Sequence, residues 1–218
     1  MQRSFDIVFS FLALVVLAPI LLPVIVILRL TGEGEVFYVQ QRSGYKGNEF
    51  GLLKFATMLK DSPRIGAGEI TVKDDPRVLP FGKLLRKTKL NELPQLWNIF
   101  IGDMSVVGPR PMVPNTYSHY SLGAREKLNT IRPGLTGIGS IVFRDEESLI
   151  SLAAENENPH DFYKRVIAPY KGELEIWYHS HRSLFLDFQL IFMTAWAIVS
   201  PETRLYEKWF KDLPKRNF

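Results

Sequence analysis

Side chains suited to handling phosphate gather in one short stretch, from Lys83 to Pro111. Several bases lead directly into a segment whose apolar residues recur with helical spacing, and Asn91 is a favourable first residue for that helix. Pro94 would then lie in the first turn, where its missing N–H costs little. Because helix N-termini favour anions, the pattern predicts a diphosphate site. The bases are Lys83, Arg86, Lys87 and Lys89.

The same stretch offers oxygen ligands and a restrained arginine. Glu92 and Asp103 carry carboxylates, and Mg²⁺ in phosphoryl-transfer sites is held by one or two carboxylates plus substrate phosphates. Arg110 lies between two prolines, and Pro111 biases its backbone towards an extended conformation, which suits phosphate recognition. The alternative on physical grounds alone is a solvated or lipid-facing basic patch beside a structural turn.

An apolar N-terminal segment must place this chemistry near a membrane. The 22 residues from Ile7 to Leu28 carry no charge, and a helix of about 20 apolar residues spans a bilayer core. Pro19 and Pro23 lie inside the segment, where each removes a backbone donor. We therefore predict a re-entrant membrane hairpin that breaks near Ala18-Pro19, with both ends at the cytoplasmic face. A single kinked spanning helix is the alternative.

The remaining sequence predicts one α+β unit of short strands and helices. Strand patterns surround the turn at 44–48, and helical patterns begin near positions 91 and 169. The apolar run 183–199 contains Asp187 and is short for a second span, so we expect an amphipathic interfacial helix there. The expected organisation is a re-entrant helix-break-helix at 1–31, a small mixed catalytic domain at 32–182, and an interfacial helix with a basic, aromatic tail at 183–218.

Composition narrows the function classes. The formal net charge is +4, which suits an anionic membrane surface or a phosphorylated ligand and is mild for a nucleic-acid-binding protein. The chain has no cysteine, which excludes a disulfide scaffold, a thiolate zinc site and a thiol nucleophile. The oligomeric state stays open, with a homo-oligomer as one option.

Several motifs together resemble a known family. The chain is similar to the bacterial sugar transferases of the monotopic phosphoglycosyl transferase superfamily, and the similarity extends over nearly its whole length. The most specific part is NELPQL followed by GDMSVVGPRP. The other matching segments are Phe5-Asp6-Ile7, Ala18-Pro19, Gln41-Arg42-Ser43-Gly44, Lys54-Phe55-Ala56-Thr57-Met58, Arg132-Pro133-Gly134-Leu135-Thr136-Gly137 and Ser183-Leu184-Phe185-Leu186-Asp187.

The resemblance implies transfer of a sugar-1-phosphate from a UDP-sugar to polyprenyl phosphate, with release of UMP. It implies a bacterial inner-membrane enzyme whose soluble part faces the cytoplasm and which starts exopolysaccharide, capsule or glycan synthesis. Glu92 would bind Mg²⁺, and Asn91, Glu92 and Arg86 would form the catalytic group. The implied substrate-binding or supporting residues are Lys54, Arg110, Pro111, Arg132 and Asp187.

One departure from the family pattern bears on catalysis. The family's usual pair is Asp-Glu, with the aspartate as nucleophile, whereas this chain has Asn91-Glu92, and an amide is a poor nucleophile. Ala56 also replaces a residue that is usually basic. Three explanations stay open: an engineered inactive variant, a natural pseudoenzyme, or a subgroup in which another carboxylate or the lipid phosphate attacks. Asp145, Glu146 and Glu147 are the acids that could compensate. The alternative function is a catalytically silent, membrane-anchored binder of nucleotide-sugars or polyprenyl phosphate.

Overall fold

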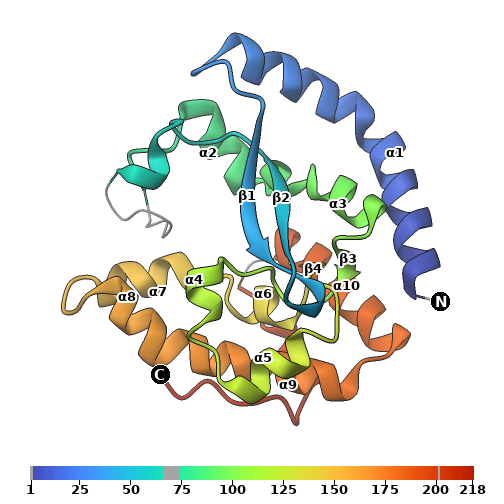
Figure 1. Cartoon of the computed structure of the whole chain (residues 1–218), viewed down its shortest axis with the longest axis vertical. Coiled ribbons are helices and arrows are strands. Elements are labelled where there is room, and N and C mark those ends of the chain that lie inside the picture. The colour runs from blue at the N-terminus through green and yellow to red at the C-terminus, as the bar shows by residue number, and fades with distance from the viewer. Residues whose placement is uncertain (1, 66–73, 201) are drawn as a thin grey trace.

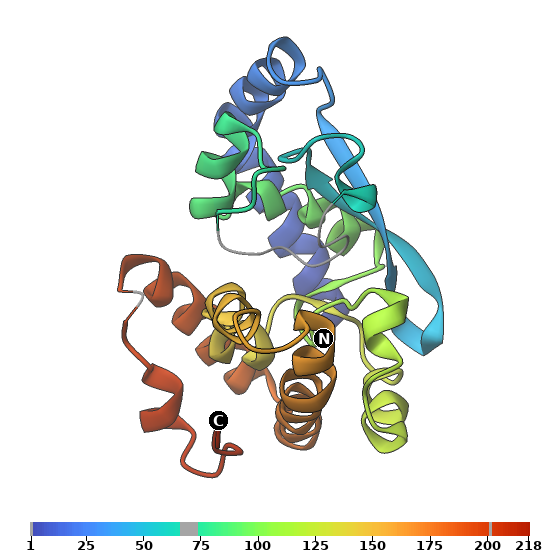
Figure 2. The ribbon, with the colours of Figure 1, turned by 90° about the vertical axis from the view of Figure 1, so that its left-hand side faces the viewer.

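The computed structural model describes residues 2–65, 74–200 and 202–218 and has a mixed α+β architecture, as the sequence predicted (Figure 1). The strands form two small two-stranded sheets. A hairpin of β1 (Phe37–Ser43) and β2 (Glu49–Phe55) extends between two groups of helices (Figures 1 and 2). The helices are α1 (Gln2–Leu30), α2 (Pro80–Lys87), α3 (Gln95–Ile101), α4 (Pro114–Tyr117), α5 (Leu122–Leu128), α6 (Ile138–Val142), α7 (Glu146–Ala153), α8 (Pro159–Phe162), α9 (Ala168–His181), α10 (Leu184–Val199) and α11 (Leu205–Trp209).

The N-terminal helix α1 is continuous. Pro19 and Pro23 lie inside it, and the predicted interruption near Ala18 is not confirmed. A helix can accommodate the backbone donor lost at a proline by bending, and Figure 1 shows α1 as an arc along one side of the molecule. Among the described residues, α1 is the one helix that is long and apolar enough to cross a membrane by length and composition.

Polar contacts fasten the first turns of α1 to the rest of the protein. Asp6 is buried, and its Oδ1 accepts hydrogen bonds from the Ser105 hydroxyl (2.9 Å) and the Val106 backbone N–H (3.0 Å). The Arg3 guanidinium donates to the carbonyls of Ile99 and Phe100 at the end of α3. These bonds satisfy groups that would otherwise be costly to bury. The start of α1 is therefore part of the folded body.

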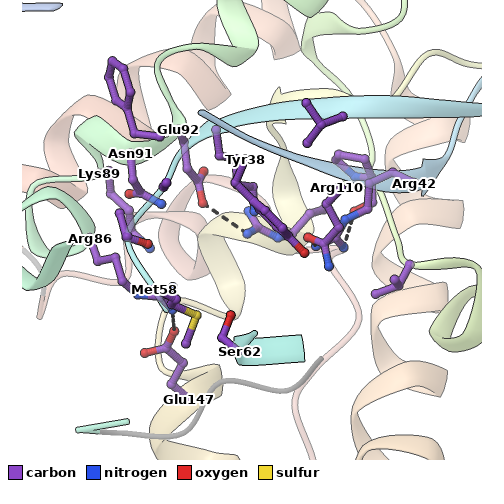
Figure 3. Close-up of a pocket in the computed structure, with 18 of the residues that line it drawn as sticks. Tyr38, Arg42, Met58, Ser62, Arg86, Lys89, Asn91, Glu92, Arg110 and Glu147 are labelled. Carbon is purple, nitrogen blue, oxygen red and sulfur yellow. Dashed lines mark hydrogen bonds and ion pairs between the residues drawn. The ribbon is translucent and has the colours of Figure 1, made fainter. Parts of the chain in front are cut away.

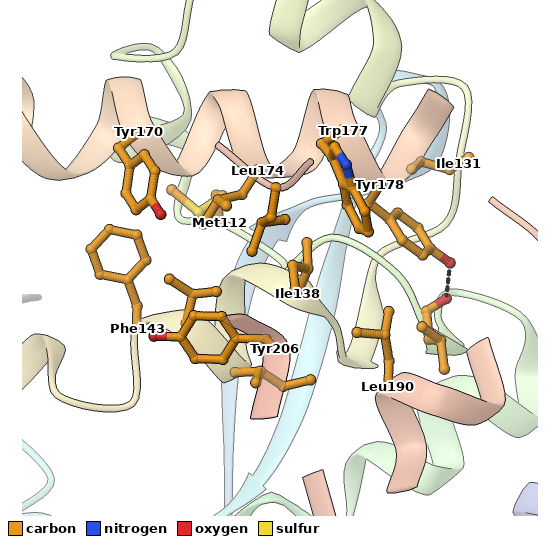
Figure 4. Packing of buried hydrophobic residues seen from close by; sticks show 14 of the residues in the cluster. Met112, Ile131, Ile138, Phe143, Tyr170, Leu174, Trp177, Tyr178, Leu190 and Tyr206 are labelled. Atoms are coloured by element: carbon orange, nitrogen blue, oxygen red, sulfur yellow. Dashed lines mark hydrogen bonds between the residues drawn. The ribbon is translucent and has the colours of Figure 1, made fainter. Parts of the chain in front are cut away.

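A second anchor holds the predicted interfacial helix. The segment does form a helix, α10, and Asp187 in its first turn is buried. The Asp187 Oδ1 accepts a 2.8 Å hydrogen bond from the Tyr178 hydroxyl of α9, and the Gln2 amide donates to its Oδ2 at 3.4 Å. Leu190 on α10 joins α9 and α6 in the main core (Figure 4). One side of α10 stays exposed, and it carries Phe185, Phe188, Phe192 and Trp196.

The segment that joins α2 to α3 differs from the sequence prediction. Positions 83–87 belong to α2, and Lys89 then adopts a left-handed backbone conformation with φ of 60°. Asn91 lies in a 3₁₀ turn (Leu90–Glu92), and Pro94 immediately precedes α3. The prediction that one helix begins at Asn91 is therefore wrong, because the positive φ and the turn separate two helices.

The short parallel sheet of β3 (Ser105–Val107) and β4 (Gly134–Thr136) supports the segment Gly108-Pro109-Arg110-Pro111. Glycine is required at this crossing, since a Cβ on Gly134 would lie 2.1 Å from the backbone nitrogen of Gly108. The Asn98 side chain ties β2 to α3 by accepting from the Leu53 N–H and donating to the Gly51 carbonyl. These contacts bring the arginine segment and the hairpin to one site.

Candidate functional site

A pocket of about 840 Å³ lies between the β1–β2 hairpin, the turn that contains Asn91, and the helices α7 and α9. Figure 3 shows its labelled side chains converging from these elements. Tyr38 and Lys54 are cross-strand partners, and both line the pocket. The predicted site residues that line it are Lys54, Arg86, Asn91, Glu92, Arg110, Pro111, Glu146 and Glu147.

One wall of the pocket has an excess of positive charge around Glu92. The Arg110 guanidinium lies 3.3 Å from the Glu92 carboxylate. Burial alone would raise the pKa of Glu92, but Arg110, Lys54 and Lys89 lower it to about 2. Glu92 is therefore a carboxylate at neutral pH. A single anion among several cations leaves the wall able to accept further negative charge.

Lys54 is the residue of this wall that can lose its positive charge near neutral pH. Burial is the main cause of a pKa lowered to about 7, and the nearby guanidiniums of Arg42, Arg110 and Arg86 add to it against the opposing effect of Glu92. Phosphate oxygens close to the ammonium would favour its charged form. Lys54 can therefore bind an anion and take up a proton as it does so.

Asn91 is buried in this wall, and its carboxamide oxygen has no hydrogen-bond partner among the described residues. A buried oxygen without a protein partner is uncommon in native proteins, and such an atom is able to accept a hydrogen bond from water or to bind an ion or a ligand group. The left-handed conformation of Lys89 and the following 3₁₀ turn present Asn91 and Glu92 to the same pocket.

The opposite wall carries balanced charges. The Lys171 ammonium lies 2.7 Å from each oxygen of Glu146, and 5.0 Å from the centre of the Phe143 ring. Burial lowers the pKa of Lys171, while Glu146 opposes that effect. Tyr163 also lines the pocket. The paired charges and the aromatic rings are typical of a structural ion pair.

A third ion pair bridges the two walls. Arg86 of α2 lies 3.1 Å from the Glu147 carboxylate of α7, and Glu147 remains exposed. Figure 3 shows this contact beside Met58. The pair is therefore accessible to a ligand that enters the pocket.

Several predicted site residues lie outside the residues that line this pocket. Arg132 donates from Nε to the Gly102 carbonyl at 2.9 Å and stacks over the Tyr45 ring. Asp187 belongs to the α9–α10 anchor, and Asp145 pairs with Arg216 at 2.9 Å. Asp103, the second predicted oxygen ligand, accepts a hydrogen bond from Asn98 at 3.3 Å. Ala18, Pro19 and Pro23 lie in α1.

Sequence reasoning identified the acids Glu146 and Glu147 but missed other residues that line the pocket. Lys171, Tyr163 and Thr116 line the pocket, yet none belongs to a motif with a recognisable chemical pattern. The available signal was the acidic cluster at 145–147, which predicted a compensating charge but gave no partner. Because Lys171 is distant in sequence from Glu146, only tertiary structure pairs them.

The fold and the site together define an α+β protein with an apolar N-terminal helix and a cationic, carboxylate-bearing pocket suited to phosphorylated ligands. Comparison with known families gives a more specific result. The model of the bacterial sugar transferase family matches residues 1–201, and the chain belongs to that family. The prediction of a sugar-phosphate transferase is confirmed at this level.

Individual relatives agree with the family. The chain is 39% identical to the exopolysaccharide production protein ExoY of Sinorhizobium fredii, over 70% of this chain and 74% of the relative. It is 32% identical to the undecaprenyl-phosphate glucose phosphotransferase of Komagataeibacter xylinus, over 88% of this chain and 35% of that longer protein. It is 29% identical to the UDP-glucose:undecaprenyl-phosphate glucose-1-phosphate transferase of Xanthomonas campestris, over 91% of this chain and 38% of the relative.

Proposed function

We propose that this protein transfers a sugar-1-phosphate from a UDP-sugar to polyprenyl phosphate and releases UMP, as an early membrane step of exopolysaccharide, capsule or glycan synthesis. The observation that carries the proposal is the cationic wall, in which Lys54, Arg86 and Arg110 line one pocket with Glu92. The Komagataeibacter and Xanthomonas relatives are both named as transferases that act on undecaprenyl phosphate, and the Xanthomonas relative is named for UDP-glucose, so we propose the same classes of acceptor and donor here.

The reaction breaks the bond between the sugar-bearing phosphorus and the bridging oxygen, which leaves with UMP. An oxygen of the lipid phosphate forms the new bond to that phosphorus, so the product is a lipid-linked diphosphosugar. Positive groups fixed around the diphosphate stabilise charge that develops on the departing oxygen. We assign this charge stabilisation to Arg110 and Lys54. The Arg110 guanidinium is positioned by its ion pair with Glu92.

The donor set of the pocket fits Mg²⁺. No group of three or more His, Cys, Asp or Glu side chains in the described part of the chain could hold a metal by itself. Magnesium commonly uses one carboxylate together with substrate phosphates, and Glu92 offers that carboxylate next in sequence to Asn91, whose oxygen has no partner in the described part of the chain. Bound there, the ion would neutralise diphosphate charge. Mg²⁺-dependent binding of UDP that is lost in Glu92→Gln would support this assignment, and equal binding in EDTA would reject it.

Asn91 requires that the attacking group be something other than residue 91. Of the three acids considered, Asp145 pairs with Arg216 and both Glu146 oxygens contact Lys171, whereas Glu147 is exposed at the pocket beside Arg86. We therefore assign the attack to Glu147: its carboxylate would form a bond to the sugar-bearing phosphorus as UMP leaves, and an oxygen of the lipid phosphate would then displace the carboxylate to give the lipid-linked product. Glu147→Gln should lower lipid-linked product strongly, while Asp145→Asn should not. Unchanged product in Glu147→Gln would leave direct attack by the lipid phosphate as the route.

Apolar side chains support membrane attachment of this site. Ring contacts link the exposed aromatic residues of α10 to neighbouring helices: Phe188 contacts the half-buried Phe5 of α1, and Phe192 stacks on the exposed Trp209 of α11. We propose that this surface lies at the bilayer interface with α1 re-entrant, so that both ends of α1 face the cytoplasm. Impermeant labelling of single cysteines at positions 2 and 31 in intact cells tests it, because the cysteine-free chain gives no background. Labelling of one end alone would establish a spanning helix.

A UMP-release screen across UDP-sugars tests the function itself. Purified full-length protein in detergent, with polyprenyl phosphate and Mg²⁺, should release UMP from at least one UDP-sugar and form the matching lipid product. Asn91→Asp measures how far the amide limits the rate. If the wild-type protein binds UDP-sugars without turnover and Asn91→Asp restores turnover, the protein is a silent binder rather than an enzyme.

A further inference from the structure

The C-terminal segment, residues 205–218, packs onto the body of the protein although it lies outside the residues that match the family model. Figure 1 shows this segment running beside α9. The Trp177 indole N–H of α9 donates to the Asp212 carboxylate at 2.9 Å, and the Tyr170 hydroxyl of α9 donates to the Pro214 carbonyl at 2.8 Å. The segment therefore follows a fixed path along α9. Three of its apolar side chains are buried in the main core: Tyr206, Phe210 and Leu213.

Arg216 of this segment contacts the corner between α6 and α7. Its Nη1 donates to both carboxylate oxygens of Asp145, at 2.9 and 3.2 Å, and its side chain is only 14% exposed. The guanidinium also lies 5.6 Å from the centre of the Phe143 ring and 5.0 Å from that of Phe218, within the range of a cation–π attraction. Phe143 is buried at the end of α6. One guanidinium thus joins the C-terminal segment to two residues of the corner.

This corner leads directly into the acidic residues of the pocket. Asp145 immediately precedes α7, and Glu146 and Glu147 form the first turn of that helix. The Asp145 side chain makes no capping hydrogen bond to α7, so its carboxylate serves the contact with Arg216 instead. Glu147 enters the pocket from this turn. Its position therefore depends on where the corner holds the start of α7.

We propose that Arg216 is a positioning residue that holds the α6–α7 corner so that the Glu147 carboxylate faces the reacting phosphorus. The inference rests on the proposed function, because the attack is assigned there to Glu147. Arg216 does not line the pocket, and it acts through Asp145 rather than on the substrate. A small displacement of an attacking group lowers the rate strongly, so a contact made outside the pocket affects turnover.

Substitutions on both sides of this contact test the inference in the full-length protein. Arg216→Met removes the donor and Asp145→Leu removes the acceptor, whereas Asp145→Asn keeps an oxygen that can accept from Arg216. We expect the kcat of UMP release to fall about tenfold in the first two variants and to stay within about threefold of wild type in Asp145→Asn. All three should bind UDP with wild-type stoichiometry. Lys215→Met, which removes the exposed neighbouring base, is the matched control and should behave as wild type.

A double-mutant cycle separates positioning of Glu147 from a general loss of active protein. If Arg216 acts through Glu147, Arg216→Met should cause little further loss of kcat in a Glu147→Gln background. A general structural defect would instead lower kcat by the same factor in both backgrounds.

A nitroxide label reports the same displacement without turnover. Ser148 is exposed in the first turn of α7, and Ser148→Cys would carry the one cysteine of the chain. The electron paramagnetic resonance spectrum of the labelled protein should show greater mobility with Arg216→Met and no change with Lys215→Met. An unchanged kcat in Arg216→Met, equal losses in the two Glu147 backgrounds, or an unchanged spectrum would each overturn the inference. Absence of UMP release from the wild-type protein would instead refute the proposed function, and the spectrum would still decide whether Arg216 holds the corner.

Discussion

The two walls of the pocket use buried charge differently. Around Glu92, several cations face one carboxylate, whereas Lys171 pairs with Glu146 in the opposite wall. A wall with surplus positive charge is incomplete until an anion arrives, and its side chains are therefore poised to bind a ligand. A wall whose charges are already paired gains nothing from a ligand and instead joins α7 to α9. Buried ions thus indicate a binding surface only when they are unbalanced.

The largest effect expected from this contrast is on stability, in the balanced wall. Lys171→Met leaves the Glu146 carboxylate without its cation, and loss of one partner of a buried pair costs about 3–5 kcal/mol. Urea unfolding in detergent should show that loss. The exposed Lys164→Met, a few residues earlier, is the control and should unfold as wild type does. An unfolding free energy unchanged in Lys171→Met would show that the pair is not structural.

In the unbalanced wall around Glu92, we expect substitutions to lower activity much more than stability. Arg110→Met should lower the kcat/KM of UMP release by about 10²–10³-fold, the usual consequence of removing one charge-stabilising group from an active site. Glu92 keeps Lys54 and Lys89 as neighbours, so the unfolding free energy should change far less than in Lys171→Met. Arg165→Met, which removes an exposed ion pair with Glu157, is the control. A large stability loss with unchanged turnover would reverse the assignment of the two walls.

The sequence identified more residues of the wall around Glu92 than of the wall around Lys171. The unbalanced wall is built from contiguous motifs, and Asn91, Glu92 and Arg110 were all identified because local patterns carry them. The two strands around the turn at 44–48 were also predicted from local patterns, whereas their register comes from the structure. Lys171 was missed because its partner, Glu146, is remote in sequence. The left-handed conformation of Lys89 was missed as well, because no local pattern predicts a positive φ at a lysine.

The pH dependence offers a finer comparison inside the unbalanced wall. Because the pKa of Lys54 is lowered to about 7, its ammonium is present below that pH and is lost as the pH rises through it. Wild-type kcat/KM should therefore fall as the pH rises above 7, whereas Lys54→Arg keeps its charge. Dividing the wild-type value by the Lys54→Arg value at each pH cancels ionisation of the substrates. A ratio that stays constant from pH 6 to 9 would mean that Lys54 does not contact the donor.

The smallest stability effect belongs to the pair that bridges the walls. Arg86 and Glu147 are 26% and 56% exposed, and an ion pair so open to water contributes roughly 0–1 kcal/mol. A double-mutant cycle of Arg86→Met and Glu147→Gln on unfolding free energy should therefore give a coupling below about 1 kcal/mol. The same cycle measured on UMP release should give a much larger coupling, because both groups then face the diphosphate. If the stability coupling instead approached that of a buried pair, the bridge would belong with the balanced wall, and Glu147 would not be available for the chemistry.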